Sequence, residues 1–280
     1  MSAPPAEAPG AADVLAQARV ENFPVASMLF PRALRPHLMA VYGFARLVDD
    51  IGDEALGDRG GLLDWVAGEL DLIYAGGAPS HLLMRHLGIT VRLFGLPRVP
   101  FDKLIEANRQ DQKVSRYATY SELVEYCSLS ANPVGELVLQ IAGVCTAERL
   151  SLSDATCTGL QLVEFWQDLG EDADRGRIYL PLDDLDRFGY GVEDLIAGRR
   201  DERFVRLMRF EAGRTRELLV RGRALAGTLR GRLAMAVRLF TAGGLAALDD
   251  LERRTFDTFG GSARASRGRR WWTAARELAR

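Results

Sequence analysis

The residues best suited to chemistry are acidic side chains at four-residue steps inside two apolar segments. In the segment LVDDIGDE, Asp49 and Asp53 are four residues apart. In the segment QLVEFWQDLGED, Glu164, Asp168 and Asp172 repeat the same step. Residues four apart lie on one face of a helix, with their Cβ atoms about 5–6 Å apart. If both segments are helical, the first pair forms one ladder of carboxylates (ladder 1) and the second group forms another (ladder 2).

Two carboxylate ladders predict a site for hard divalent cations. Mg²⁺ prefers carboxylate and water oxygens, uses only one or two protein carboxylates per ion, and completes its shell with substrate phosphates. Facing ladders would therefore bind a diphosphate through bridging Mg²⁺ ions. A solvated helix end explains a single acidic pair equally well, but it explains two ladders on separate apolar segments poorly. A di-iron centre is the chemical rival, but such sites use Glu-x-x-His pairs, and neither ladder contains a histidine.

Basic and aromatic residues beside the ladders are candidate substrate contacts. Tyr42 and Arg46 continue the helical stripe of ladder 1, while Arg177 and Tyr179 follow ladder 2. Arginine donates bidentate hydrogen bonds to phosphate oxygens, so the two arginines are expected to bind diphosphate. For each of these residues, ordinary packing or surface ion pairing is the alternative.

Long helices must position these residues, and helical periodicity runs through almost the whole chain. The apolar residues recur at steps of three and four, and Gly- or Pro-bearing stretches such as GGAPS and GLPRVP separate the segments. We expect helices at roughly 33–54, 60–75, 80–94, 101–112, 120–147, 152–173, 201–229 and 232–257. The clearest non-helical interval is GRIYLPLDD, around residues 177–184. With no run of alternating strands, the pattern predicts one all-α domain.

One predicted helix contains a proline. Pro133 lies in the apolar segment YCSLSANPVGELVLQIAG, among several small residues. A proline inside a helix removes a hydrogen bond and kinks the helix. Close helix packing and an opening for a long hydrocarbon explain this segment equally well.

Composition limits the classes of partner and the domain plan. A formal net charge of −2 lacks the cationic excess of a nucleic-acid binder, so no nucleic-acid partner is expected. Residues 1–12 are predicted to be a disordered leader, residues 13–260 the catalytic domain, and residues 261–280 a basic tail. The tail carries six arginines against one glutamate, together with Trp271 and Trp272. A peripheral contact with an anionic membrane suits this tail, and a solvated tail suits it equally well.

The N-terminus shows neither a basic start nor an apolar run typical of a signal peptide. We therefore expect a cytoplasmic protein, peripheral to the inner membrane if the tail docks there.

The chain resembles the squalene and phytoene synthase family from about residue 21 to about residue 256. The segments ENFPVAS, YGFARLVDDIGDE, SANPVG and FWQDLGEDADRGRIYLP are most similar to the hydroxysqualene synthase branch of bacterial hopanoid pathways. This resemblance implies an isoprenoid-synthase-like helical bundle around a central cavity. It also implies a Mg²⁺-dependent enzyme, with roughly two or three ions, that converts presqualene diphosphate and water into hydroxysqualene and diphosphate. No NADPH is then expected, and other hopanoid-pathway enzymes would hand over the prenyl diphosphate.

The resemblance also assigns roles by motif. Asp49, Asp53, Asp168 and Asp172 match the metal-binding aspartates of the family. The positions matching those that line the diphosphate and prenyl site are Phe23, Tyr42, Arg46, Gln161, Arg177 and Tyr179.

This sequence departs from the family pattern beside ladder 2. Glu164 stands where the family commonly has a metal-binding asparagine, so it is expected to bind Mg²⁺ as well, and it adds negative charge to the predicted site. Gln167 stands where relatives that make squalene or dehydrosqualene often carry arginine. Apolar and aromatic walls that include Phe23, Phe44 and Phe165 are expected to shelter a carbocation.

Three other functions remain open on the sequence. A head-to-head prenyltransferase that condenses two prenyl diphosphates into presqualene diphosphate, squalene or phytoene would use the same aspartates. A catalytically silent helical assembly factor need not keep the four aspartates. A soluble carrier of apolar ligands would need neither metal nor diphosphate.

Overall fold

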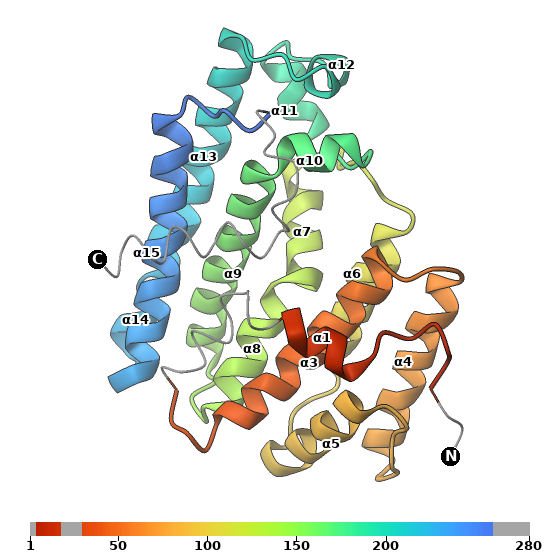
Figure 1. Ribbon diagram of the computed structural model, residues 1–280. Helices are drawn as coiled ribbons and strands as arrows, with labels where there is room; N and C mark the ends of the chain where they lie inside the picture. Colours follow the sequence, from red (N-terminus) through yellow and green to blue (C-terminus); the bar gives the residue numbers. More distant parts are fainter. Residues whose placement is uncertain (1–3, 18–29, 260–280) are drawn as a thin grey trace. The chain divides into compact units, whose positions relative to one another are not determined.

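The computed structural model describes residues 4–17 and 30–259. Within these ranges the chain is helical and contains no strand, apart from a single parallel bridge between Arg116 and Ile178. This confirms the predicted all-α class (Figure 1). The chain divides into two compact units, Met1–Lys113 with Leu129–Leu150 (unit 1) and Val114–Ser128 with Ser151–Arg280 (unit 2). The predicted single catalytic domain over residues 13–260 stays a prediction.

Unit 1 is built around one long helix, α3, that carries ladder 1. Helices α4, α5, α6 and α8 pack against α3, and α1 also contacts it. The helices of this unit are α1 (Ala11–Gln17), α3 (Arg35–Asp53), α4 (Arg59–Tyr74), α5 (Leu82–Phe94), α6 (Val99–Asp111) and α8 (Asn132–Ile141).

Helix α3 forms where the apolar spacing predicts it. Pro36 lies in its first turn, where the missing N–H costs nothing. Leu38, Val41 and Val48 recur at helical steps and are fully buried, so they anchor one face of the helix in the core. The charged stripe lies on another face, which is why α3 can hold ladder 1 without burying every carboxylate.

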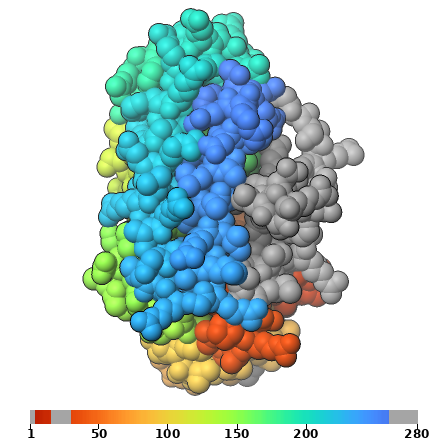
Figure 2. All heavy atoms as spheres, turned by 90° about the vertical axis from the view of Figure 1, so that its left-hand side faces the viewer, coloured from red at the N-terminus to blue at the C-terminus, as the bar shows by residue number. Residues whose placement is uncertain are grey.

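Unit 2 is built around α9, α13 and α15. In both views α13 and α15 run side by side, and their contact is direct (Figures 1 and 2). Trp166 on α9 donates a buried 2.8 Å hydrogen bond to the hydroxyl of Thr215 on α13, which fixes α9 against its neighbour. The helices of this unit are α7 (Tyr120–Ser130), which ends in unit 1, α9 (Ala147–Gln167), which begins in unit 1, α10 (Leu169–Asp174), α11 (Leu182–Arg187), α12 (Val192–Ile196), α13 (Glu202–Gly222), α14 (Leu225–Thr228) and α15 (Gly231–Arg253).

Three predicted helices are divided in the structure. The helix predicted over 120–147 is α7 (Tyr120–Ser130) followed by α8, and the chain passes from unit 2 to unit 1 near this break. Pro133 lies in the first turn of α8, where proline is tolerated, so it starts a helix and does not kink one. The helix predicted over 152–173 breaks at Asp168, and the one predicted over 201–229 breaks after Gly222.

The leader predicted over residues 1–12 overlaps the described structure, because α1 begins at Ala11. The ring Nε2 of His81 donates to the carbonyl of Pro9 at 3.1 Å, and Val14 on α1 is fully buried. These long-range contacts hold residues 4–17 on unit 1, and composition alone does not reveal them. The predicted basic tail over residues 261–280 lies outside the described residues.

Among the described residues, one helix is long and apolar enough to cross a membrane by length and composition. This helix is α15, which packs on α13 and α14 and buries Leu248 and Leu251. The core helix of a soluble protein gives the same signal, so this feature is weak evidence for a membrane span.

Candidate active site

Ladder 1 lies on the C-terminal half of α3. Tyr42, Arg46, Asp49 and Asp53 share one helix face, as their spacing predicts. Asp49 is exposed, Asp53 is half-buried and Tyr42 is buried. The structure therefore brings the four predicted residues of this stripe together on one surface of unit 1.

Asn108 on α6 is a neighbour of ladder 1 that sequence reasoning missed. Its side-chain nitrogen donates to Oδ1 of Asp49 at 3.1 Å and to the carbonyl of Leu104 at 3.2 Å. Because both of these partners are acceptors, the amide nitrogen must face them. Asn108 thus holds one oxygen of Asp49 in a fixed direction.

A second amide joins α6 to the end of α3. Gln112 donates to the carbonyl of Gly52 at 2.9 Å and to the carbonyl of Asn108 at 3.1 Å. Gly52 is the sequence feature that could have predicted this contact. It interrupts an acidic helix segment, where a better helix former would stabilise the helix. A close approach by another element explains a glycine at such a position.

The environment of Asp49 raises the pKa of its carboxyl group. Although part of the Asp49 side chain reaches solvent, the protein packed around its carboxyl group desolvates it and raises its pKa to about 7, against the hydrogen bond from Asn108 and the charge of Arg46. Negative charges on Asp53 and Asp111 raise this pKa further. A bound divalent cation reverses this balance because it is the largest local charge. A cation bound here would therefore favour the ionised form of Asp49.

Arg46 is engaged by acidic neighbours on its own helix. Its guanidinium lies 2.6 Å from Asp50 Oδ1 and 3.4 Å from Glu54 Oε1. Asp50 is buried, with 4% of its surface exposed, so this ion pair compensates the cost of burying that carboxylate. The sequence predicted Arg46 as a phosphate donor. The structure shows that some of its donor capacity serves α3 itself.

Ladder 2 crosses a helix boundary in unit 2. Helix α9 ends at Gln167 and α10 begins at Leu169. Four-residue backbone hydrogen bonds nevertheless continue through the break, from Asp168 N to Glu164 O at 3.0 Å and from Asp172 N to Asp168 O at 2.8 Å. The ladder therefore keeps its helical step.

The members of ladder 2 differ in burial. Asp168 and Asp172 are buried, with 4% and 2% of their surfaces exposed, whereas Glu164 is half-buried. Gln161, another predicted site residue, donates to Oε2 of Glu164 at 3.4 Å. The structure thus places Gln161 beside the glutamate that departs from the family pattern.

The segment after ladder 2 folds back beneath it. The backbone N–H of Arg177 donates to the carbonyl of Asp172 at 2.8 Å, and that of Ile178 donates to Ser115 at 2.8 Å. Tyr179 stacks on Phe165 of α9 with a centroid distance of 3.8 Å and an interplanar angle of 6°. The predicted residues Arg177 and Tyr179 are therefore held against the helix that carries ladder 2.

Two further aromatic residues join this stack, and the sequence analysis did not select them. The ring centroids of Tyr117 and Tyr126 lie 5.9 Å and 6.1 Å from that of Tyr179. Together with Phe165 and Tyr179 they form one aromatic cluster in unit 2. No local motif identifies this cluster, because its members come from three separate segments.

Two of the residues predicted to shelter a carbocation are not in this cluster. Phe44 is fully buried and packs edge-on against Phe101 at 5.1 Å, on the face of α3 opposite Tyr42 and Arg46. It is a core residue of unit 1, and its role in sheltering a carbocation stays a prediction. Phe23 lies outside the described residues.

The donor set fits Mg²⁺. Within residues 4–17 and 30–259, no group of three or more His, Cys, Asp or Glu side chains is arranged around one point to hold a metal ion. Magnesium does not need such a cage, since it binds through one or two carboxylates and takes its remaining ligands from water and phosphate. The carboxylates predicted for this role are Asp49 and Asp53 in unit 1 and Asp168 and Asp172 in unit 2.

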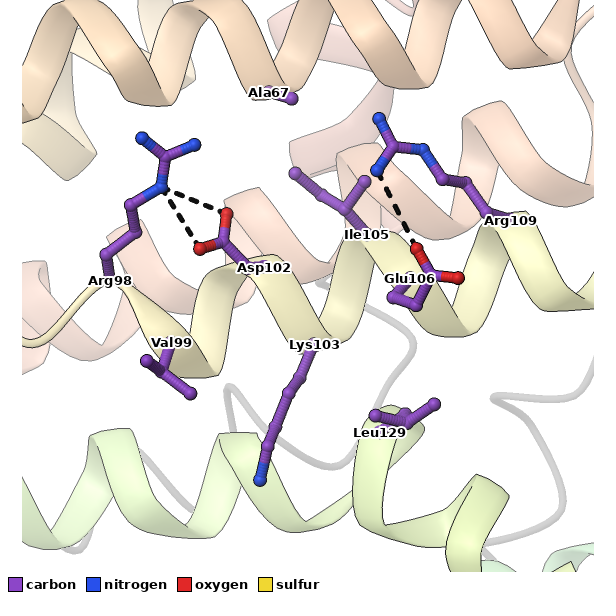
Figure 3. Close-up of a pocket in the computed structure, with 9 residues that line it drawn as sticks. All are labelled: Ala67, Arg98, Val99, Asp102, Lys103, Ile105, Glu106, Arg109 and Leu129. Carbon is purple, nitrogen blue, oxygen red and sulfur yellow. Dashed lines mark hydrogen bonds and ion pairs between the residues drawn. The ribbon is translucent and has the colours of Figure 1, made fainter.

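A pocket of about 500 Å³ lies elsewhere on unit 1 and contains no predicted site residue. Its charged lining residues are largely paired: Arg98 with Asp102 and Arg109 with Glu106 (Figure 3). The apolar part of its lining comes from Ala67, Val99, Ile105 and Leu129. It is therefore separate from the ladder of this unit.

The chain is similar to known proteins over most of its length. The squalene/phytoene synthase family model matches residues 16–272. The hydroxysqualene synthase of Rhodopseudomonas palustris is 35% identical, over 80% of this chain and 77% of that protein. The phytoene synthase of Arthrospira platensis is 33% identical, over 85% of this chain and 82% of that protein.

Solved structures agree with these relatives. Squalene synthase HpnC from Alicyclobacillus acidocaldarius superposes with a TM-score of 0.83 at 41% identity, over 89% of this chain and 96% of that one. A dehydrosqualene synthase at 21% identity has a TM-score of 0.82 and supports the fold alone. The two carboxylate ladders, the helical fold and these matches agree, and the chain belongs to the squalene/phytoene synthase family of isoprenoid synthases.

Proposed function

We propose that this enzyme converts presqualene diphosphate and water into hydroxysqualene and diphosphate with the help of Mg²⁺. The observation that carries the proposal is the pair of carboxylate ladders, one on α3 and one across α9 and α10. The choice of product follows the hydroxysqualene synthase relatives, of which a second, from Sinorhizobium fredii, is 33% identical over 76% of this chain.

The ladders and the arginines prepare the leaving group. Asp49 and Asp53 of ladder 1 and Asp168 and Asp172 of ladder 2 would hold the metal ions that bind the diphosphate. Bound Mg²⁺ supplies Lewis acidity to the departing diphosphate. The guanidinium of Arg177 adds positive charge where negative charge develops on the phosphate oxygens.

The reaction balances without a reductant. The bond between carbon and the diphosphate oxygen breaks, and the electron pair leaves with the diphosphate. A water oxygen then bonds to the rearranged cation and loses its proton to solvent. Since no hydride is added, NADPH is not required. The faces of the aromatic cluster around Tyr179 and Phe165 would stabilise the cation through their π electrons.

Head-to-head condensation of two prenyl diphosphates is the second candidate, and a specific observation favours it. Relatives named phytoene synthase match this chain as well as the hydroxysqualene synthases do, including one from Thermus thermophilus at 34% identity over 87% of this chain. The same carboxylates would serve that reaction, so only substrate trials separate the two functions.

The test is incubation of the purified protein with Mg²⁺ and presqualene diphosphate, with and without NADPH, beside farnesyl diphosphate alone. Products are resolved by mass spectrometry. We expect hydroxysqualene from presqualene diphosphate without NADPH. Turnover of farnesyl diphosphate alone would move the enzyme to the condensing branch, and turnover of neither would contradict both functions.

A matched pair of variants tests the role of ladder 2. Asp172 is buried, while Asp174, two residues further along α10, is exposed. Asp172→Asn removes one charge at the proposed metal site and should reduce kcat at least about a hundredfold. Asp174→Asn removes the same charge outside it and should leave kcat within about twofold of the parent. Equal effects of the two substitutions on kcat would contradict a role for ladder 2 in the reaction.

The proposed function also includes a cellular location for the enzyme and a source for its substrate. We place the enzyme in the cytoplasm, peripheral to the inner membrane, with presqualene diphosphate handed over by the enzyme that makes it. Fractionation of the native cell would test the location, and recovery in the extracellular fraction would contradict it.

A further inference from the structure

Helix α5 exposes an apolar stripe. Leu82, Ile89 and Leu93 are 50%, 54% and 64% exposed, and their spacing of seven and four residues places them on one line along the helix. On the opposite face Leu83, Met84, Leu87 and Val91 are buried in unit 1. Helix α5, whose position is shown in Figure 1, is therefore apolar on its buried face and on its exposed face.

The outward face of α5 carries only positive charge. Arg85, His86 and Arg92 are exposed beside the stripe. The helix contains no acidic residue, and none occurs anywhere from residue 72 to residue 101. At the contact with α3, His37 packs edge-on against Phe94 of α5 at 4.8 Å and hydrogen-bonds Thr90 at 3.0 Å. In a chain with a net charge of −2, an exposed helix face whose charged residues are arginines points to an anionic partner.

Charge argues against two other occupants. A twofold contact between two copies of the chain would use the same surface twice, so Arg85 and Arg92 of one copy would face those of the other. The C-terminal tail, with six arginines and one glutamate, has the same sign of charge as α5 and would be repelled.

We propose that the outward face of α5 docks on an anionic lipid surface. Aliphatic residues on a helix face edged by arginines are the pattern of an interfacial helix, which buries its apolar side chains at the headgroup boundary while its arginines bind lipid phosphates. The choice of lipid over an acidic protein rests on the proposed function, because its product is a water-insoluble long-chain alcohol that a bilayer would accept. This contact is separate from any contact made by the tail.

Vesicle binding tests the proposal without any turnover. Full-length protein is mixed with vesicles of phosphatidylcholine alone or of phosphatidylcholine with phosphatidylglycerol, and the bound fraction is measured by flotation. We expect binding to the anionic vesicles that weakens as salt is added, and much weaker binding to the neutral ones.

Two variants separate the contribution of the apolar side chains to vesicle binding from that of the arginines. Replacing Leu82, Ile89 and Leu93 together by Gln should weaken binding to anionic vesicles about tenfold or more. Replacing Arg85 and Arg92 together by Gln should have a similar effect and reduce the salt dependence. The matched control replaces Ile196 and Val220 by Gln, since these are exposed apolar residues of unit 2 with exposures of 58% and 56%. The control should bind vesicles like the parent.

Several outcomes would overturn the proposal. The parent could fail to bind anionic vesicles, or the Leu82, Ile89 and Leu93 variant could bind them as strongly as the parent does. The control variant could also lose as much vesicle binding as the α5 variants do. Size-exclusion chromatography with light scattering accompanies each variant, and a change from dimer to monomer in the α5 variants would assign the face to self-association. Loss of binding only in a Trp271→Ala, Trp272→Ala variant would assign the membrane contact to the tail alone.

Measuring turnover of soluble substrate by the α5 variants distinguishes failure of this inference from failure of the proposed function. Because α5 carries no proposed catalytic residue, kcat should stay within about twofold of the parent while vesicle binding falls. Failure of the proposed reaction in the parent would leave the vesicle result unchanged.

Discussion

The side-chain oxygen of Asn108 lies where residue 52 would place a β-carbon: a Cβ built on Gly52 stands 2.1 Å from Asn108 Oδ1. Glycine is therefore needed at this point of α3 because α6 approaches it closely. The same approach brings the amide nitrogen of Asn108 to Asp49. The glycine of the DDIGDE motif thus gives ladder 1 its neighbour from α6.

This relationship predicts a strong coupling between two substitutions. Gly52→Ala gains up to about 1 kcal/mol of helix propensity but forces an overpacked contact that costs about 1–3 kcal/mol, so a net destabilisation is expected. In the Asn108→Ala background the clashing oxygen is gone and the nearest remaining contact is the Cβ of residue 108 at 3.3 Å, so Gly52→Ala should cost clearly less than in the parent. Urea unfolding of the four proteins in the cycle measures this coupling. Additive effects would contradict the steric relationship.

Asn108 should also affect metal binding. Asn108→Leu keeps the volume of the side chain but removes the hydrogen bond to Asp49. Residues that orient a metal ligand typically contribute about ten- to a hundredfold in affinity, so the binding of Mg²⁺ with inorganic diphosphate should weaken by roughly tenfold or more. Calorimetry measures this affinity without turnover. Lys103→Gln, on the same helix at the separate pocket, is the control and should bind like the parent.

A buried acid on α13 should make stability depend on pH. Glu211 is fully buried and receives two hydrogen bonds from Arg214, at 2.9 Å and 2.6 Å. Burial raises the pKa of Glu211 to about 8, against the charge of Arg214 and with the support of Asp184. The folded state therefore binds the proton more tightly than the unfolded state, so the contribution is fully present below about pH 4.5 and is lost as pH rises toward about 8.

Glu211→Gln should remove that slope, because glutamine mimics the protonated acid and does not titrate. The free energy of unfolding is measured at about pH 5 and about pH 8. Glu217→Gln, an exposed acid on the same helix, is the control and should keep the slope of the parent. The same slope in both variants would show that Glu211 is not the titrating group.

Two substitutions of Tyr179, which stacks on Phe165, distinguish its packing role from a chemical role. Tyr179→Phe keeps the ring and should change the free energy of unfolding by less than about 1 kcal/mol, whereas Tyr179→Leu loses the stack and should cost about 1–3 kcal/mol. If the hydroxyl contacts substrate, kcat falls in the phenylalanine variant although its stability is retained. Equal stability of the two variants in thermal unfolding would contradict a structural role for the stack.

The sequence by itself determined the all-α class, most helix positions and the two ladders. These follow from local rules: apolar residues at steps of three and four mark helices, and carboxylates four apart share a helix face wherever the helix forms. The motifs around Asp49 and Asp168 also pointed to the family that the comparisons show. The roles of the predicted site residues remain predictions.

Tertiary structure decided what no local pattern encodes. The bond from Asn108 to Asp49 joins residues 59 positions apart, and the aromatic cluster around Tyr179 gathers rings from three segments. Pro133 starts a helix and does not kink one, because the chain passes between units at that point. Phe44 faces the core because its side of α3 packs on Phe101. Each of these depends on which elements pack together, and packing is settled by the shapes and polar groups of distant segments.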